Sequence, residues 1–227
     1  MHEHSTLCVA STPTIDDVLL VAALGFPVFP LKPTTKQPAI KHWQAHATTD
    51  PSTLQDSWQQ WPGANIGHVI PRGRLVIDID PRHGGLTHWK NLLAQHGDLP
   101  PTWTAWSGRH DGGFHLYFTV PVTLDIPSAI DLAPGVQVLG FQHNVLLPPS
   151  IHPDTQQAYR WDEQLSPLQG CPEAPAPLWV LDVLTKHSRP TRPALAPTKT
   201  QKSARSSSKQ GPPPGYLVCS SKAIPFP

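Results

Sequence analysis

The stretch LVIDID at residues 75–80 ends an apolar run with two carboxylates two residues apart. In a β-strand, side chains at positions i and i+2 point to the same face, so a strand here would present Asp78 and Asp80 together. Two carboxylates this close repel each other, and a hard divalent cation such as Mg²⁺ relieves that repulsion and bridges to substrate phosphates. The alternative is an acidic strand end that turns into a loop at Pro81. The motif alone does not decide between them.

The charge of the chain is unevenly distributed. Its formal net charge is +1, but eight of its 17 Lys and Arg residues, and none of its 16 acidic residues, lie from Thr185 onward. The preceding body therefore carries nine basic and 16 acidic residues, a net charge of −7 with histidine neutral. An acidic body argues against broad non-specific binding of nucleic acid, whereas a local basic cleft stays compatible with it.

The cysteines and the hydropathy pattern indicate a soluble, cytoplasmic protein. Cys8, Cys171 and Cys219 form neither a disulfide framework nor the paired spacing of a zinc site. No apolar run reaches membrane-spanning length, so we expect no membrane association. The N-terminal segment also lacks the basic and then apolar order of a signal peptide.

Apolar periodicity predicts short elements joined by turns, in keeping with 29 prolines in 227 residues. The expected helices are 15–24, 51–61, 86–96 and 177–184. The expected strands are 26–31, 65–70, 74–78, 102–107, 114–118, 136–139, 144–147 and the edge candidate 158–161. Short turns predict two hairpins, one joining 65–70 to 74–78 and one joining 102–107 to 114–118. In helix 51–61, the stripe Leu54, Trp58 and Trp61 is interpreted as core rather than as a base-stacking platform.

These elements predict one catalytic domain at 15–186 with a flexible N-terminus at 1–14. Residues 187–227 are rich in Ser, Pro and Lys and poor in apolar residues, so we expect a disordered basic tail. Such a tail either binds nucleic acid electrostatically or serves as a solvated spacer, and the sequence leaves both open.

An ordered set of short motifs runs through the body of the chain. They are GFPVFPL at 25–31, KQP at 36–38, TTD at 48–50, PGANIG at 62–67, DIDPRHGG at 78–85, GGFHLYF at 112–118, LPPSIH at 147–152 and YRW at 159–161. Over about residues 15–185, this set resembles the bifunctional DNA primase/polymerase N-terminal domain, the Prim-Pol branch of the archaeo-eukaryotic primase superfamily.

The resemblance implies an α+β Prim-Pol fold, in which helices flank an RRM-like antiparallel or mixed sheet. It implies template-dependent transfer of nucleotides from NTPs or dNTPs with Mg²⁺ or Mn²⁺, by a DNA primase, a DNA polymerase or both. Asp78 and Asp80 match the metal-binding acids of the family, and His115 matches the histidine that contacts the phosphates of the incoming nucleotide. The partners implied are a single-stranded DNA template and a separately encoded replicative helicase, in replication or repair of a mobile genetic element.

Further residues are candidates of second rank. Lys36, Asn65 and Arg109 are candidates for contact with triphosphate, template or sugar, and each could equally be a surface or turn residue. Ser150 and His152 are not interpreted as a hydrolase pair, because no G-x-S-x-G elbow accompanies them.

One position departs from the family pattern. Where relatives carry a third acid on a later strand, this chain has Gln137, which can offer a metal its carbonyl oxygen but no charge. Asp131 could substitute if the register is shifted. Two alternatives to an active enzyme therefore stay open: a weakened remnant that binds nucleotide or single-stranded DNA, and a metal-dependent phosphoesterase that uses the same acids.

Overall fold

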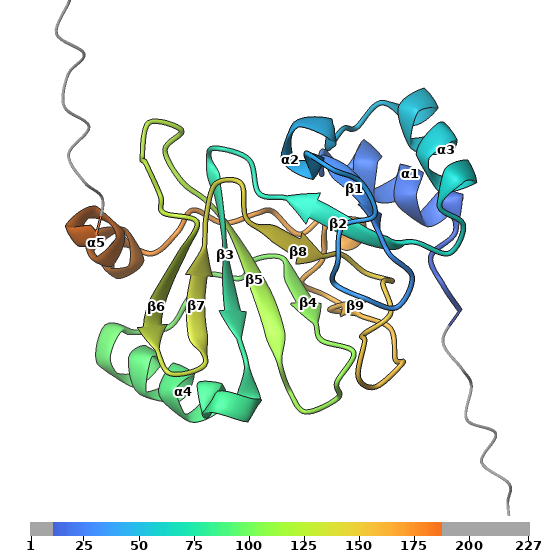
Figure 1. Ribbon diagram of the computed structural model, residues 1–227. Helices are drawn as coiled ribbons and strands as arrows, with labels where there is room; N and C mark the ends of the chain where they lie inside the picture. The colour runs from blue at the N-terminus through green and yellow to red at the C-terminus, as the bar shows by residue number, and fades with distance from the viewer. Residues whose placement is uncertain (1–10, 188–227) are drawn as a thin grey trace, which may run out of the picture. The chain divides into compact units, whose positions relative to one another are not determined.

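The structure is a computed structural model that describes residues 11–187. Most of the segment expected to be flexible, 1–14, and all but the first residue of the expected tail, 187–227, lie outside the described residues. Two antiparallel sheets organise the described part (Figure 1). The smaller has the order β1 (Val28–Leu31), β2 (Asn65–Val69), β8 (Asn144–Leu146). The larger has the order β6 (Ala129–Ala133), β7 (Val136–Leu139), β3 (Arg74–Ile79), β5 (Phe114–Thr119), β4 (Thr104–Trp106), β9 (Arg160–Trp161).

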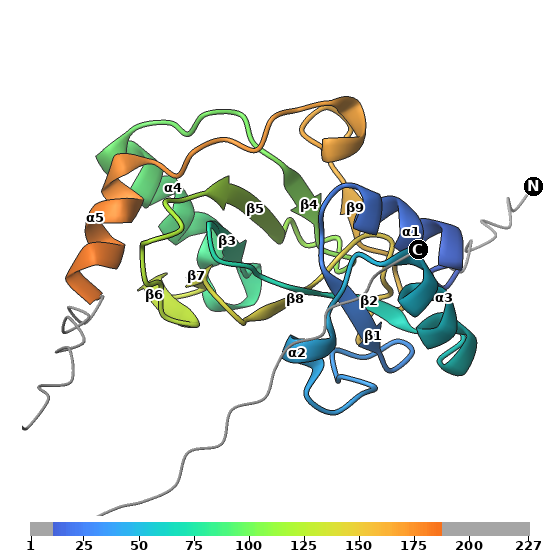
Figure 2. The same ribbon diagram turned by 90° about the horizontal axis from the view of Figure 1, so that it is seen from above.

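Helices flank both sheets, which confirms the α+β class. Figure 2 shows the helices α4 (Gly85–His96) and α5 (Leu178–His187) with the larger sheet, and α1 (Ile15–Ala23), α2 (Trp43–His46) and α3 (Pro51–Gln60) beside the smaller one. Two 3₁₀ turns, η1 (Pro81–His83) and η2 (Pro167–Gln169), complete the elements. None of the helices in the described part is long and apolar enough to cross a membrane.

Local sequence explains where two of the helices begin. Thr14 forms a capping box with Asp17 at the start of α1, so that each side chain accepts a hydrogen bond from the other residue's backbone N–H. Asp50 caps α3 by accepting from the backbone N–H of Thr53 at 2.8 Å, and Pro51 occupies the first helical position. Both helix starts agree with the sequence prediction.

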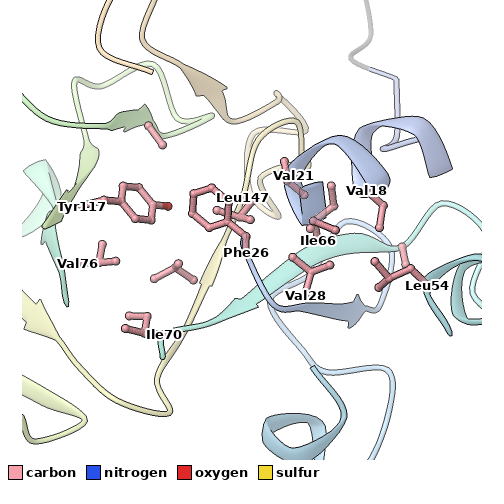
Figure 3. Close-up of a cluster of buried hydrophobic side chains, with 14 of the residues drawn as sticks. Val18, Val21, Phe26, Val28, Leu54, Ile66, Ile70, Val76, Tyr117 and Leu147 are labelled. Carbon is pink, nitrogen blue, oxygen red and sulfur yellow. The ribbon is translucent and has the colours of Figure 1, made fainter. Parts of the chain in front are cut away.

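One core fills the space between the two sheets and the first helices. Figure 3 shows Phe26 between Tyr117 of the larger sheet and the α1 residues Val18 and Val21. Leu54 and Trp58 of α3 belong to the same cluster, with Trp61 packed against it. The aromatic stripe of α3 is therefore core, as predicted.

A second core covers the opposite face of the larger sheet. Leu75, Ile77 and Ile79 of β3 pack there with Trp89 of α4 and Val180 of α5. Because side chains alternate along a strand, Val76 and Asp78 point to the other face, toward the smaller sheet. The apolar run of β3 thus serves two cores, and its carboxylate is left on the face that the two sheets share.

The predicted hairpin between 65–70 and 74–78 is wrong. β2 pairs with β1 and β8, whereas β3 pairs with β5 and β7. Each is a central strand with both edges already paired, so the turn at 71–73 carries the chain from one sheet to the other. The second predicted hairpin is confirmed, since β4 pairs antiparallel with β5. The strand β6 and the short helix α2 were not predicted.

Candidate active site

The pairing register places four polar residues in one row across the larger sheet. Asp78 on β3 lies opposite His115 on β5 and opposite Gln137 on β7, and Gln137 in turn lies opposite Asp131 on β6. Directly opposed residues of antiparallel strands share a face, with Cβ atoms about 5 Å apart. The row therefore brings side chains from four separate segments onto the face that looks toward the smaller sheet.

Asp78 and His115 form a pair within this row. The Nε2 atom of His115 lies 3.3 Å from Oδ1 of Asp78, and the two side chains are 11% and 33% exposed, respectively. Burial alone would raise the pKa of Asp78, but the hydrogen bond from His115, its charge and that of Lys36 outweigh burial and lower the pKa. The Asp78 carboxylate is therefore ionised at neutral pH.

Asp80 follows the strand and caps the 3₁₀ turn η1. Its Oδ1 accepts from the backbone N–H and from Nε of Arg82, both at 3.0 Å, and its Oδ2 accepts from Nη2 of Arg82 at 2.7 Å. Nδ1 of His83 lies 3.2 Å from the same Oδ2. These contacts, with the Arg82 side chain foremost, lower the pKa of Asp80 to about 2.

The two acids and His115 line one cavity. It is a polar hollow, and its wall also contains Lys36, Arg82, Ser107, Arg109, Asp111, His152 and Tyr159. A second cavity adjoins it, because both are lined by Lys36, Asp78, His115 and Tyr159. Gln137, His143 and Asn144 line this second cavity. The structure thus brings together five of the predicted site residues around the first cavity: Asp78, Asp80, His115, Lys36 and Arg109. Gln137 lines the adjoining second cavity.

Lys36 and Arg109 reach the site from loops. Lys36 follows β1 on the side of the smaller sheet and lines both cavities. Arg109 lies between β4 and β5, where its Nε is 3.0 Å from Asp111 and its Nη1 is 2.6 Å from Asp154. Each side chain therefore brings a cationic group to the lining of the cavity that the carboxylates also line.

Asn65 does not join them. It is fully buried and lines neither cavity. Its amide nitrogen donates to the carbonyls of Thr35 at 3.1 Å and Ile151 at 2.8 Å, and its carbonyl accepts from the backbone N–H of Ile151. Asn65 therefore holds the loop next to Lys36 against the 151 segment, and its polar atoms are already used within the protein.

Ser150 also has a structural role. Its hydroxyl accepts from the backbone N–H of Ile66 at 2.8 Å and the side chain is fully buried, which agrees with its exclusion as a hydrolase nucleophile. His152 lines the cavity and stacks on Tyr159, with 5.7 Å between the ring centroids. Burial raises the pKa of Tyr159, so its hydroxyl stays protonated.

Sequence reasoning did not single out Arg82 or Tyr159. Arg82 could have been found, because an arginine two residues after Asp80 and next to a proline lies within reach of that carboxylate. Tyr159 stands in the YRW motif at 159–161, but the sequence analysis assigned it no role at the site. It reaches the cavity from a segment 79 residues after Asp80, and no local pattern specifies that approach.

The donor set fits a hard cation that keeps part of its water shell. Among residues 11–187, no group of three or more histidine, cysteine or acidic side chains is arranged to hold a metal ion. Asp78 and Asp80 offer carboxylates, and Gln137 offers a carbonyl oxygen, since its Nε2 donates to Asp131 at 2.6 Å. Mg²⁺ characteristically binds through one or two carboxylates, with waters and substrate phosphates completing its shell.

Comparison with known proteins places this geometry in a family. The family model described as "Bifunctional DNA primase/polymerase, N-terminal" matches residues 18–179, a span that includes every residue lining the two cavities. No curated protein matched the chain. The match covers well over half of the 227 residues. The chain therefore belongs to the bifunctional DNA primase/polymerase N-terminal (Prim-Pol) family.

Proposed function

We propose that this domain catalyses template-dependent nucleotidyl transfer from NTPs or dNTPs, with Mg²⁺ or Mn²⁺ held by Asp78 and Asp80. One observation carries the proposal: both acids and His115 line a single cavity whose wall also contains three cationic side chains, Lys36, Arg82 and Arg109. A triphosphate needs this combination, because cations offset its negative charge while carboxylates hold the divalent ion that accompanies it.

Each residue has a role that its position supports. Asp78 is both a metal ligand and the partner that orients His115 through Nε2. The other ring nitrogen of His115, Nδ1, is buried without a hydrogen-bond partner among the described residues, so the ring has an unused hydrogen-bonding atom beside the cavity that His115 lines. Lys36 and Arg109 supply further positive charge to the triphosphate. When bound, the divalent ion would neutralise phosphate charge and activate the attacking 3′-hydroxyl.

The test is primer extension by the full chain on a single-stranded template. Labelled dNTPs or NTPs are supplied with Mg²⁺ or Mn²⁺, and a reaction without primer detects priming. We expect product from the wild type, loss of product in Asp78→Asn, and unchanged product in Asp98→Asn, the same chemical change at an exposed position outside the cavity. Absence of product with both metals, from the wild type and with or without primer, would refute the active-enzyme proposal.

A second candidate is a domain that binds nucleotide or single-stranded DNA without extending it. Gln137 favours it, because this neutral side chain lies directly opposite Asp78, at a position where the resemblance to the family implies an acid. Binding of a fluorescent dNTP and of an oligonucleotide without extension, together with extension gained in Gln137→Asp, would support it. Cleavage of a preformed strand without added nucleotide would instead indicate the phosphoesterase. The helicase partner and the mobile genetic element stay predictions from the family resemblance.

A further inference from the structure

Arg82 occupies the carboxylate that the proposed function assigns to a metal ion. Its guanidinium contacts both oxygens of Asp80, with Nε 3.0 Å from Oδ1 and Nη2 2.7 Å from Oδ2. This two-point contact uses the face of the carboxylate that is best suited to a charged partner. A divalent cation on Asp80 would therefore meet a positive charge already in place.

The backbone around Asp80 is held tightly. A Cβ added to Gly85 or to Gly135 would lie 2.5 or 2.6 Å from the carbonyl oxygen of Asp80, so both close approaches require glycine. The backbone N–H of Asp80 donates to Gly135 at 2.8 Å, and its Oδ1 accepts from the backbone N–H of Arg82. Asp80 thus keeps its position whatever the Arg82 side chain does.

The Arg82 side chain, by contrast, is 46% exposed and has a second acid within reach. Its Nη1 lies 4.0 Å from Oδ2 of Asp154, which also binds Arg109 at 2.6 Å. Arg109 also pairs with Asp111, with its Nε 3.0 Å from Oδ2, so acidic and basic side chains alternate along this part of the surface. Arg82 can therefore leave Asp80 without losing all of its negative neighbours, since Asp154 stays within its reach.

We propose that Arg82 is an exchangeable counter-ion: it neutralises Asp80 while no divalent cation is bound, and it transfers to substrate phosphate oxygens when a cation takes the carboxylate. The inference rests on the proposed function and names one more substrate-binding residue for it. A guanidinium suits this exchange, because its planar fork binds a carboxylate and a phosphate with the same two-point geometry. Metal and triphosphate would then strengthen each other's binding, because the metal replaces Arg82 on Asp80 and the triphosphate gives the released Arg82 a new anionic partner.

This exchange predicts opposite effects of one substitution on two affinities. In Arg82→Gln, binding of Mn²⁺ alone should tighten about fivefold, the equivalent of releasing an exposed ion pair. Binding of a fluorescent dNTP at saturating Mn²⁺, without template or primer, should weaken by roughly tenfold, the equivalent of one charge-assisted hydrogen bond. Both are equilibrium titrations of the full chain, the first followed by the electron paramagnetic resonance of free Mn²⁺, and neither requires catalysis.

Three further variants separate this exchange from a general charge effect. Arg72→Gln removes the same charge at the other end of β3, where Arg72 pairs with Asp125, and it should leave both affinities unchanged. Arg82→Lys keeps the charge but loses the fork, and we expect an intermediate gain in Mn²⁺ affinity. The double variant Asp80→Asn/Arg82→Gln should lose that gain, because the released carboxylate is absent.

The outcomes distinguish this inference from the proposed function. If Arg82→Gln leaves Mn²⁺ affinity unchanged or weakens it while the wild type extends primers, Arg82 is a structural partner of Asp80 and only the exchange is refuted. An equal gain in Arg72→Gln would refute it as well. If neither the wild type nor Arg82→Gln binds Mn²⁺ or nucleotide, both the exchange and the proposed function fail.

Discussion

Replacement of Gln137 by aspartate would place a third carboxylate between Asp78 and Asp131 in the row that crosses the larger sheet. Opposed Cβ atoms lie about 5 Å apart, which puts neighbouring carboxylates roughly 6 Å from each other. Coulomb's law then gives a repulsion of about 3 kcal/mol between the new carboxylate and the partly buried Asp78, at an effective dielectric constant near 20. The repulsion from the exposed Asp131 is about 0.7 kcal/mol, at a dielectric constant near 80. Partial compensation of Asp78 by His115 brings the sum to about 3 kcal/mol.

This repulsion should appear as a fall in melting temperature that Mn²⁺ reverses. For a domain of this size, about 3 kcal/mol corresponds to roughly 6–12 °C. A cation at 100 times its dissociation constant returns about 2.7 kcal/mol, nearly the whole loss. The assay is thermal unfolding of wild type, Gln137→Asp and Gln137→Asn, each in EDTA and in millimolar Mn²⁺.

Asparagine is the matched control, because it has the shape of aspartate without its charge. Gln137→Asn should show neither the large fall in EDTA nor the recovery in Mn²⁺. If the two variants melt alike in both conditions, the side chain at 137 does not face the acids closely enough to share a cation with them. The assignment of Gln137 to the site would then be refuted.

Three further predictions concern buried polar groups. Burial lowers the pKa of His68 to about 3, so the unfolded chain binds a proton near pH 6.5 and the folded chain does not. The free energy of unfolding, measured by urea titration, should therefore fall by about 2 kcal/mol between pH 6.5 and 4.5. In His68→Asn, this dependence of stability on pH should be much weaker. Glu173→Gln should lower the free energy of unfolding in urea by about 3–5 kcal/mol, because Arg74 loses a buried partner at 2.6 Å. Asp125→Asn breaks an exposed pair with Arg72 and should lower it by under about 1 kcal/mol. Equal losses in the two variants would contradict this reasoning. Asn65→Ala should weaken nucleotide affinity through the loop beside Lys36 as well as lowering stability, and an unchanged affinity would assign Asn65 to the fold alone.

Most elements could be predicted because their signals are local. The spacing of Leu54, Trp58 and Trp61 indicates a helix face, and Asp50 with Pro51 marks where that helix begins. Sheet membership could not be predicted in the same way. The short turn at 71–73 suggested a hairpin, but pairing depends on which edges other strands have already filled, and those strands lie far away in the sequence.

The candidate site could likewise be predicted only where its residues are close together in the sequence. The two acids are two residues apart, so strand geometry alone places them near each other, whereas their alignment with His115 and Gln137 depends on the register of three strands. The resemblance to a family pointed to these residues in advance, but it did not give the register that aligns them. The structural role of Asn65 had no local signal, because its partner Ile151 lies 86 residues away.

Two of the three passages of chain between the sheets have a consequence for how this domain can evolve. The passage from β2 to β3 and the passage from β7 to β8 are bonded to each other, since Ile70 donates to the carbonyl of His143 at 2.9 Å and accepts from Gln142 at 3.0 Å. These two hydrogen bonds tie the two passages together, and His143 itself lines the second cavity. An insertion beside Ile70 would therefore shift His143 and alter the shape of that cavity without changing any of the acidic residues.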